Sequence, residues 1–389
     1  MDRFLTRPRS PRPSSAAEDE ESTELKLAIL ASLHPDQSLK HYVIPSASTV
    51  STVSPDVSPK KRKIVSKKGA TLHLYDPSDV AEHTPCTIIH NFLPVEDADQ
   101  LLRELLDEAK TFNKITFKLF ENVVSSPHTS SFYVETSDDV KTQQASYFYN
   151  GGQLTDVRRI TPVLAKVKPL VQEAVNREIQ HWIRTRCSGG RKLKHQSPQP
   201  WAPNAAFVNC YSGARQNVGW HSDQLTYLGP RAVIGSVSLG VAREFRVRRV
   251  LPKDADSKRP EDSDAEGQIS IHLPHNSLLV MHAEMQEEWK HCIASALSID
   301  PHPIAGDKRI NITYRHYRPE MHPSKTPRCD CKVPCVLRVV QRKRENFGKY
   351  FWVCYAGNII GKEGCSFFQW AEFDDDGNPR PSRKVSRPP

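Results

Sequence analysis

The segment RINITYR, residues 309–315, is the feature that most limits how this chain can fold. Side chains of a strand alternate between two faces, so this strand has an apolar face and a polar face that contains two arginines. The polar face consists of Arg309, Asn311, Thr313 and Arg315. A guanidinium that is buried without an anion is very unfavourable. If both faces are covered, the strand must border an anion-binding cavity; otherwise it is a solvated basic edge.

The spacing of the two arginines adds a geometric expectation. At the rise of a strand, their Cα atoms lie about 20 Å apart. Their long side chains would then approach one small dianion from opposite ends.

A succession of strand-like segments surrounds this one. Apolar stretches of strand length occur at 86–92, 205–211, 232–240, 243–250, 268–273, 277–282 and 309–317. Helices followed by a run of strands predict an α+β fold with a sandwich or barrel at its centre. The charged stretch 252–267 is expected to be an exposed hairpin insertion.

Two helices are predicted before most of these strands. Residues 93–112 have acids in the first turn and leucines on one face. Residues 163–183 follow Thr161 and Pro162, which suit the N-cap and first position of a helix. Pro169 is expected to kink or restart this second helix.

Two histidines and one aspartate are candidates for a metal site. GWHSDQLTYLG places His221 and Asp223 one residue apart, and His291 follows an apolar strand. Two imidazoles and one carboxylate form the facial triad that binds Fe(II) and leaves positions open for a co-substrate and O₂. By residue type alone, His272 and His282 are equally available, so the His-x-Asp pair does not by itself decide the third ligand.

The combined pattern resembles a known family, the AlkB-type Fe(II)/2-oxoglutarate dioxygenases that dealkylate nucleic-acid bases. It consists of Asn209-x-Tyr211, His221-x-Asp223, His291 and Arg309-x-Asn311-x-Thr313-x-Arg315. The resemblance covers residues 85–318. It implies a double-stranded β-helix (jelly-roll) core with N-terminal helices and a nucleotide-recognition lid.

The resemblance also implies the ligands of the site. His221, Asp223 and His291 would bind Fe(II). Arg309 would pair with the far carboxylate of 2-oxoglutarate with help from Tyr211. The rest of the co-substrate would be held by Asn209, Asn311 and Arg315.

The implied reaction couples oxidative decarboxylation of 2-oxoglutarate, to succinate and CO₂, with hydroxylation of an N-methyl carbon that then leaves as formaldehyde. The protein supplies positioning and a dry cavity. The target base must leave its stack. QQASYFYNGG lies where the family has its lid, so Tyr147 or Tyr149 could stack on the base opposite His221; packing within the sheet is the alternative.

The segments WHSDQ and SVSLGVAREFRVRR look closest to the sequences of the branch of the family that acts on single-stranded DNA and RNA. One departure is Gln224, where that branch has a second acid. This difference concerns the lid and the substrate preference rather than the iron.

Five of the nine cysteines crowd into residues 329–365. Four thiolates suit a closed, structural Zn²⁺ site, formed by Cys329, Cys331, Cys354 and Cys365. Cys335 would be a spare buried thiol. Residues 327–373 resemble a GRF-type zinc finger, which is associated with single-stranded DNA. The family is named after a Gly-Arg-Phe motif, and this chain has Lys349 in place of the arginine. The lysine keeps the positive charge but cannot form the two parallel hydrogen bonds of a guanidinium.

Residues 1–80 are rich in Ser, Pro and charge, and we expect them to be disordered apart from one short amphipathic helix. SPKKRKIVSKK (58–68) resembles a nuclear localisation signal, and DRFLTR resembles a sliding-clamp-binding peptide through Arg3–Arg7. The alternative for both is a solvated tail. Residues 376–389 are expected to be a disordered tail. Apolar runs are too short to cross a bilayer, which predicts a soluble, intracellular protein. The basic segment 58–68 predicts that it enters the nucleus.

These patterns predict three parts: residues 1–80, a dioxygenase domain at 81–320 and a zinc finger at 325–375. The leading hypothesis is an oxidative demethylase of 1-methyladenine and 3-methylcytosine in DNA, with RNA as a further substrate, and the net charge of +9 favours such polyanionic partners. The alternatives are an RNA demethylase of a regulatory mark and a catalytically silent nucleic-acid-binding adaptor. A zinc hydrolase would leave Arg309 and Arg315 without a role.

Overall fold

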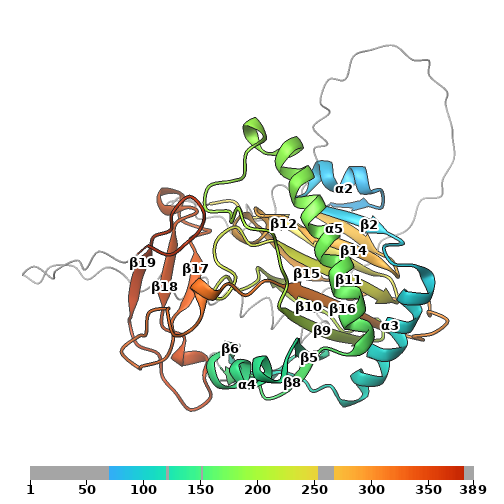
Figure 1. Ribbon diagram of the computed structural model, residues 1–389, viewed down its shortest axis with the longest axis horizontal. Helices are drawn as coiled ribbons and strands as arrows, with labels where there is room; N and C mark the ends of the chain where they lie inside the picture. Colours follow the sequence, from blue (N-terminus) through green and yellow to red (C-terminus); the bar gives the residue numbers. More distant parts are fainter. Residues whose placement is uncertain (1–69, 120–121, 150–151, 253–266, 381–389) are drawn as a thin grey trace, which may run out of the picture.

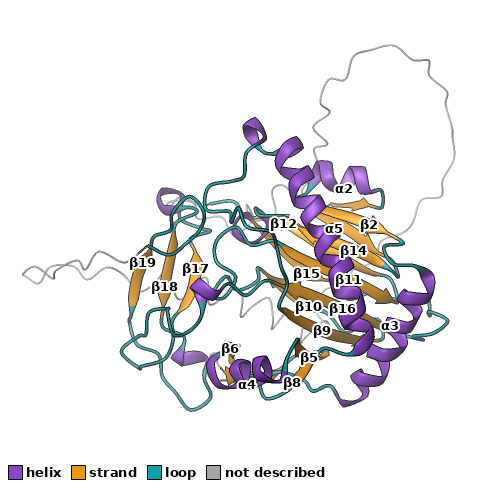
Figure 2. Ribbon diagram, in the orientation of Figure 1, coloured by secondary structure: helices purple, strands orange, loops and turns teal. Residues whose placement is uncertain are grey.

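Two facing β-sheets form the centre of the protein in the computed structural model (Figure 2). The structure describes residues 70–119, 122–149, 152–252 and 267–380. The predicted clamp-binding peptide, amphipathic helix and nuclear localisation signal therefore lie outside the described residues, as do residues 253–266 of the charged insertion. Within the described residues, no helix is both long enough and apolar enough to span a membrane.

The larger sheet has the strand order β2-β14-β11-β16-β9-β5-β8 in the described part of the chain. Its strands are β2 (Cys86–His90), β5 (Thr129–Val134), β8 (Val157–Arg159), β9 (Ala205–Ser212), β11 (Ile234–Gly240), β14 (Ser277–Met281) and β16 (Lys308–Arg315). Neighbours pair antiparallel, except that β5 and β8 pair parallel. RINITYR thus forms the central strand, β16, with both edges paired.

The smaller sheet has the order β1-β13-β12-β15-β10. Its strands are β1 (Thr71–Leu74), β10 (Val218–His221), β12 (Arg243–Arg249), β13 (Gln268–Leu273) and β15 (Trp289–Ile293). Strands β12 and β13 pair antiparallel, so the charged insertion does join two neighbouring antiparallel strands, as expected. Two short hairpins flank the sheets, β3 (Thr116–Leu119) with β4 (Asn122–Ser125), and β6 (Phe148–Tyr149) with β7 (Gly152–Gln153).

Helices α3 (Val95–Glu108) and α5 (Pro162–Arg186) cover the outer face of the larger sheet (Figure 1). The other α-helices of the described residues are α2 (Pro77–His83), α4 (Ser137–Ser146) and α6 (Met285–Glu288). Helix α5 continues through Pro169, so a restart at this position is wrong. The flanking Val167 and Val171 are fully buried against the sheet, and this packing holds the helix together despite the missing hydrogen-bond donor.

Alternation along β16 sorts its side chains as the sequence predicted. Ile310, Ile312 and Tyr314 pack in the cluster between the sheet and its two helices. The polar residues of the strand face the space between the sheets and line a cavity there. Both faces are thus covered, and the solvated basic edge is excluded. With helices on one face and a second sheet on the other, the predicted α+β, jelly-roll class is confirmed.

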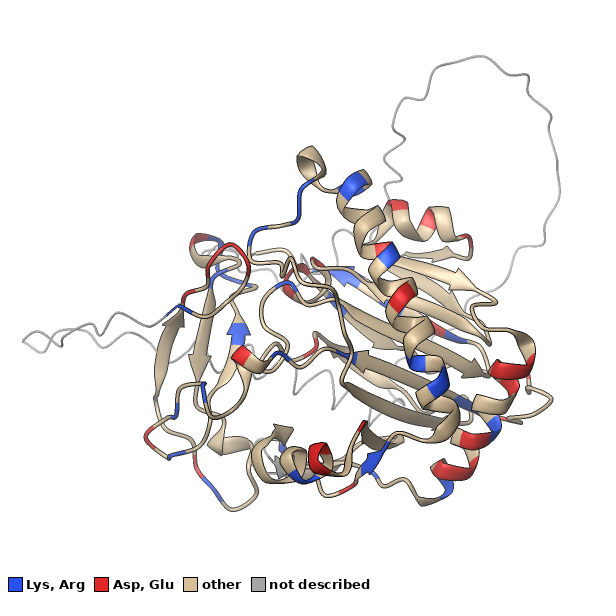
Figure 3. Ribbon diagram, viewed as in Figure 1, with Lys and Arg blue, Asp and Glu red and all other residues tan. Residues whose placement is uncertain are grey.

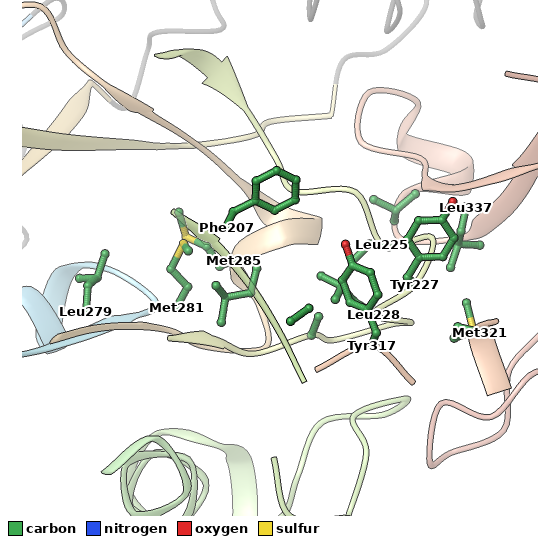
Figure 4. Packing of buried hydrophobic residues seen from close by; sticks show 14 of the residues in the cluster. Phe207, Leu225, Tyr227, Leu228, Leu279, Met281, Met285, Tyr317, Met321 and Leu337 are labelled. Atoms are coloured by element: carbon green, nitrogen blue, oxygen red, sulfur yellow. The ribbon is translucent and has the colours of Figure 1, made fainter. Parts of the chain in front are cut away.

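A small three-stranded sheet follows, formed by β17 (Val336–Val339), β18 (Tyr350–Val353) and β19 (Phe368–Ala371). Short 3₁₀ turns η5 (Arg344–Asn346) and η6 (Ala356–Asn358) flank β18. Leu337 of β17 belongs to the same buried cluster as Leu225 and Leu228 (Figure 4). The cysteine-rich segment therefore packs directly on the two-sheet core.

The ordered part of the protein extends further at both ends than we expected. Residues 71–80 were assigned to a disordered region, but β1 pairs with β13 and α2 follows it. Residues 377 and 378, assigned to the expected C-terminal tail, are also held in place, since Gly377 accepts a hydrogen bond from Arg318 at 2.9 Å and Asn378 accepts another at 2.8 Å. At Gly377, φ is +73° and an added Cβ would lie 2.3 Å from the carbonyl oxygen of His195, so glycine is required there.

Candidate active site

Two strands of the smaller sheet bring the candidate metal ligands together. His221 ends β10 and lies directly opposite His291 of β15. Asp223 follows two residues later, with its Oδ1 3.6 Å from His221 Nε2 and 3.5 Å from His291 Nε2. One ligand atom from each residue lies within 4.8 Å of the others, which is the spacing that a single metal ion would need.

The electrostatics of this group suit a metal ligand set. His221 donates from Nδ1 to the carbonyl of Gly219 at 2.8 Å, which leaves Nε2 for a metal. Burial, followed by the nearby His291, lowers the pKa of His221 to about 4, so the ring is neutral. Burial is the largest influence on Asp223 and opposes its ionisation, but Arg315, His291 and His221 together outweigh it, so the pKa of the carboxyl lies below its usual range. Neutral imidazole and ionised carboxylate are the forms that bind metals.

The loop that carries Asp223 is fixed by its neighbours. Asp223 N donates to Oε1 of Gln286 at 2.7 Å, and Ser222 Oγ donates to the carbonyl of Trp289 at 2.8 Å. The ring of His291 stacks on Phe245 with centroids 5.2 Å apart. The triad is therefore held in place before any ion binds.

Arg309 forms a cationic end of the same cavity. Its side chain is 1% exposed, and Nη2 donates to Ser238 Oγ at 2.8 Å. Its Nε and Nη1 atoms are buried without a hydrogen-bond partner among the described residues. Burial lowers the pKa of this guanidinium to about 10, which still leaves it charged near neutral pH. Two unpaired donors on a buried cation point to an anion that binds here.

Cross-strand register assembles the polar residues around Arg309. Tyr211 of β9 lies opposite Arg309, and Asn209 lies opposite Asn311. The guanidinium lies 5.4 Å from the centroid of the Tyr211 ring. All four side chains line the cavity that contains the metal-ligand triad. A dicarboxylate fits this donor set, with one carboxylate at the guanidinium of Arg309, which has unpaired donors.

Arg315 differs from the geometric expectation. Its Nε and Nη2 atoms donate to Asp223 Oδ2 at 3.0 and 2.6 Å, so most of this guanidinium orients the aspartate. Its Nη1 atom is buried without a partner within the described residues. The two arginines thus do not close on one dianion from opposite ends, because the carboxylate of Asp223 is nearer to Arg315.

The other histidines named by residue type lie elsewhere. His282 stacks on Trp182 with centroids 4.2 Å apart and bonds to Thr87. His272 forms a separate three-residue group with His73 and Glu244 on the smaller sheet. Neither lies with His221, so the register of β10 with β15 decides the third member of the triad.

The two lid tyrosines occupy different positions. Tyr149 lines the cavity and packs on Phe207 at a centroid distance of 4.7 Å. Tyr147 packs against Tyr227, Tyr317 and His322 and is not among the lining residues. Of the two, Tyr149 is placed to meet a molecule in the cavity.

Four thiols of the cysteine-rich segment form a second group. The sulfur atoms of Cys329, Cys331, Cys354 and Cys365 lie within 4.8 Å of one another. The backbone N–H groups of Ala356 and Cys365 donate to Cys354 Sγ at 3.3 and 3.4 Å. Four sulfurs at this spacing suit a tetrahedral zinc ion. Cys335 is fully buried and stands outside the four.

Several residues of the cavity escaped the sequence analysis. Ser236 and Ser238 hold Asn311 and Arg309, and His128 stacks on Tyr211 with centroids 4.7 Å apart. The period of two in β11 could have pointed to the serines, since both face the cavity side of that strand. The cysteine-rich segment also contributes lining residues that no sequence signal marks. These are Arg338, Tyr355 and Asn358.

Comparison with known proteins adds family information. A model of the 2OG-Fe(II) oxygenase superfamily matches residues 85–315, and a GRF zinc finger model matches residues 327–374. The predicted AlkB-type dioxygenase with a C-terminal GRF finger is confirmed at the level of the family, and Fe(II), 2-oxoglutarate and zinc are its implied cofactors.

Individual relatives cover part of the chain. "DNA oxidative demethylase ALKBH2" of Arabidopsis thaliana is 36% identical over 122 residues, which are 29% of this chain and 37% of that protein. "Alpha-ketoglutarate-dependent dioxygenase alkB homolog 3" of Rattus norvegicus is 29% identical over 117 residues, 30% of this chain and 36% of that protein. "DNA oxidative demethylase ALKBH2" of Mus musculus is 27% identical over 225 residues, 57% of this chain and 76% of that protein. The solved structure of OsALKBH1 matches with a TM-score of 0.40 and 15% identity, covering 60% of this chain and 99% of that chain.

Proposed function

The chain belongs to the 2OG-Fe(II) oxygenase superfamily, and we propose that it removes methyl groups from the nitrogen atoms of nucleic-acid bases by oxidation. The observation that carries this proposal is the cavity itself. It combines a two-histidine, one-carboxylate group with a buried arginine that has two unpaired donors. Relatives named as DNA oxidative demethylases point to bases as the substrate class.

Each side chain of the cavity has a defined role in this proposal. His221, Asp223 and His291 hold Fe(II). Arg309 binds the far carboxylate of 2-oxoglutarate, and Tyr211, Asn209 and Asn311 hold the rest of the molecule. Arg315 keeps the Asp223 carboxylate ionised and turned toward the metal. Its Nη1 has no partner among the described residues and would be available to the co-substrate.

When bound, iron and 2-oxoglutarate supply the oxidation of the methyl carbon, with release of succinate, CO₂ and formaldehyde. The chain's own residues exclude water and orient the base. Phe207, Phe245 and Met281 give the cavity apolar walls. Tyr149 faces the cavity from the lid and stacks on the target base after the base leaves its strand.

The substrates we propose are 1-methyladenine and 3-methylcytosine in DNA, with RNA as a further substrate. Two features support a polyanionic strand. The net charge is +9, and acids gather on α3, at the end of the molecule away from β17–β19 (Figure 3). The zinc finger at 325–375 would bind single strands, and the basic segment 58–68 and Arg3–Arg7 would direct the protein to the nucleus and to a sliding clamp.

A direct test supplies the purified protein with Fe(II), 2-oxoglutarate, O₂ and an oligonucleotide that contains 1-methyladenine. We expect formaldehyde and succinate in equal amounts, and His221→Ala should abolish both. His83→Ala, which alters a histidine of α2 outside the cavity, is the matched control and should keep the activity. Turnover that survives His221→Ala would refute the assignment of the ligands.

A competition experiment determines whether DNA or RNA is the preferred substrate. DNA and RNA oligonucleotides of one sequence, each with the same methylated base, are mixed at equal concentration. Preferred repair of the DNA strand supports the proposal, whereas exclusive turnover of the RNA strand would favour a regulatory RNA mark. Binding of either strand without any formaldehyde would indicate a silent adaptor.

A further inference from the structure

The cavity of the metal-ligand triad has one wall that the oxygenase domain does not supply. Arg338, Tyr355 and Asn358 of the zinc finger line it together with His221 and Asp223. Turn η6 of the finger also contacts β3. The finger is thus part of the cavity and not a module on a separate surface.

Tyr355 is built into this wall. Its side chain is 6% exposed, and its hydroxyl accepts a hydrogen bond from Gln224 Nε2 at 3.2 Å. Gln224 directly follows Asp223, so the tyrosine is anchored one residue from a candidate iron ligand. Tyr149 of the lid lines the same cavity. Aromatic rings from the lid and the finger therefore border the space that a base would enter.

Arg338 provides a cation in the same wall. It lines the cavity and also a smaller pocket beside residues 221–225. Within the described residues, its guanidinium has no hydrogen-bond or ion-pair partner. A half-buried, unpaired arginine beside an aromatic ring suits a nucleotide, with the ring for the base and the cation for the phosphate.

Both residues depend on how the finger is held. Tyr355 directly follows Cys354, whose sulfur accepts hydrogen bonds from the N–H groups of Ala356 and Cys365. Strand β17, which carries Arg338, docks through Leu337 N, which donates to Thr226 Oγ1 at 3.2 Å. Gln341 Nε2 donates to the carbonyl oxygens of Gln286 and Glu287 at 3.1 and 3.2 Å. A zinc ion held by the four thiols would fix the wall together with these contacts.

We propose that the zinc finger is a wall of the substrate pocket, in which Tyr355 contacts the methylated base and Arg338 binds the phosphate of the same nucleotide. The inference rests on the proposed function and assigns substrate recognition within the active site to residues of the finger. Its consequence is specific: the finger contributes to the distinction between methylated and unmethylated bases, in addition to any binding of the strand.

The test measures binding apart from turnover. Protein loaded with Mn(II), 2-oxoglutarate and zinc is titrated, by fluorescence anisotropy, with labelled single strands that do or do not contain 1-methyladenine. Tyr355→Ala should weaken binding of the methylated strand about 10-fold and remove most of the preference for it. Tyr355→Phe, which keeps the ring, should retain the preference.

Trp370→Ala is the matched aromatic control in the finger. Trp370 is 44% exposed and lies outside the cavity lining, so this change should weaken both strands equally and leave the preference intact. Arg338→Gln should weaken both strands and reduce the salt dependence of binding by about one phosphate contact. Zinc content and the affinity for 2-oxoglutarate, measured for every variant, identify any that has lost its fold.

The outcomes separate the inference from the proposed function. If the wild type releases no formaldehyde from the methylated strand, the proposed function fails. If it does, and folded Tyr355→Ala keeps the wild-type preference, the wall has no role in base recognition and the inference is overturned. If Tyr355→Ala does not fold, Tyr355→Leu replaces it and decides the question in the same way.

Discussion

Two buried arginines lie near each other in the cavity region and use their donors differently. Arg243 is 3% exposed and donates to the carbonyl oxygens of Gly213, Ala214, Gln216 and Ala294. Arg309 is equally buried, yet two of its nitrogen atoms have no partner in the described part of the chain. Arg243 leaves only its Nε without a partner among the described residues and holds a loop through its two other nitrogen atoms. Arg309 leaves two nitrogen atoms unpaired and lines the cavity, so it marks a ligand site.

This contrast predicts different results for the same substitution. Arg309→Lys replaces a planar fork by a point charge, so we expect KM for 2-oxoglutarate to rise about 10- to 100-fold. Arg243→Lys should instead lower the free energy of unfolding by about 1–3 kcal/mol and leave that KM unchanged. Steady-state kinetics and urea unfolding of both variants check this, and an equal KM effect from both would contradict it.

At the scale of elements, α5 packs closely against the larger sheet at Gly235 of β11. A Cβ added there would lie 3.0 Å from Cγ2 of Val175 and 3.3 Å from the Trp201 ring. The absence of a side chain thus lets the helix pack on the strand whose next residue, Ser236, supports Asn311.

A larger side chain at position 235 should overpack this contact and lower the stability of the protein by a measurable amount. Gly235→Val should lower the free energy of unfolding by about 1–3 kcal/mol because the strand and the helix must separate. Adding Val175→Ala should recover part of the loss, since it removes the methyl groups that the new side chain meets. Urea unfolding of the single and double variants measures the coupling; strictly additive losses would argue against this contact.

A buried carboxyl lies between α6 and β18. Glu287 Oε1 accepts hydrogen bonds from Tyr350 Oη at 3.0 Å and from Arg231 N at 2.7 Å. Burial raises the pKa of Glu287 from 4.5 to about 7, although Arg231 opposes the shift. Between these values the folded protein binds more protons than the unfolded chain, so the free energy of unfolding falls as pH rises from about 4.5 to about 7.

Glu287→Gln removes this titration and keeps an acceptor for both donors. We expect the stability of the variant relative to wild type to increase with pH across this window, by at most about 3 kcal/mol. Unfolding curves of both proteins at pH 5 and pH 8 give the difference directly. A difference that is the same at both pH values would show that Glu287 does not titrate there.

Helices and strands could be predicted from the sequence where their hydrophobic periodicity was strong. They were missed where their formation depends on pairing or packing with distant segments. Alternation in RINITYR gave the two faces of β16, and helical spacing gave α3 and α5. Strand β5, TSSFYV, was missed because its buried run has no alternation, and β1 because it pairs with a strand about 200 residues away. The role of Tyr355 could not be predicted, since its place in the cavity depends on how the finger docks and not on any local pattern.

At the scale of the molecule, the finger and the two-sheet core share one buried cluster. Cys329, Cys335, Leu337 and Trp352 pack in it together with residues of both sheets. Because zinc organises the segment that contributes these side chains, metal loss should affect the core as well as the finger.

Removing one thiolate tests this coupling. Cys354→Ser should release one Zn²⁺ per chain and lower the midpoint of thermal unfolding of the whole protein. Zinc analysis and calorimetry measure both effects, and Cys187→Ser, at a cysteine outside the group of four, is the control. Unchanged zinc content would refute the four-thiolate site.

The account depends most on one cavity that holds a metal ion and a dicarboxylate side by side. A crystal structure of the protein with Mn(II) and 2-oxoglutarate, with anomalous scattering recorded for manganese, examines this directly. We predict one manganese peak bonded to His221, Asp223 and His291, and a carboxylate of 2-oxoglutarate hydrogen-bonded to the guanidinium of Arg309. Manganese bound elsewhere, or Arg309 with no carboxylate beside it, would contradict the account.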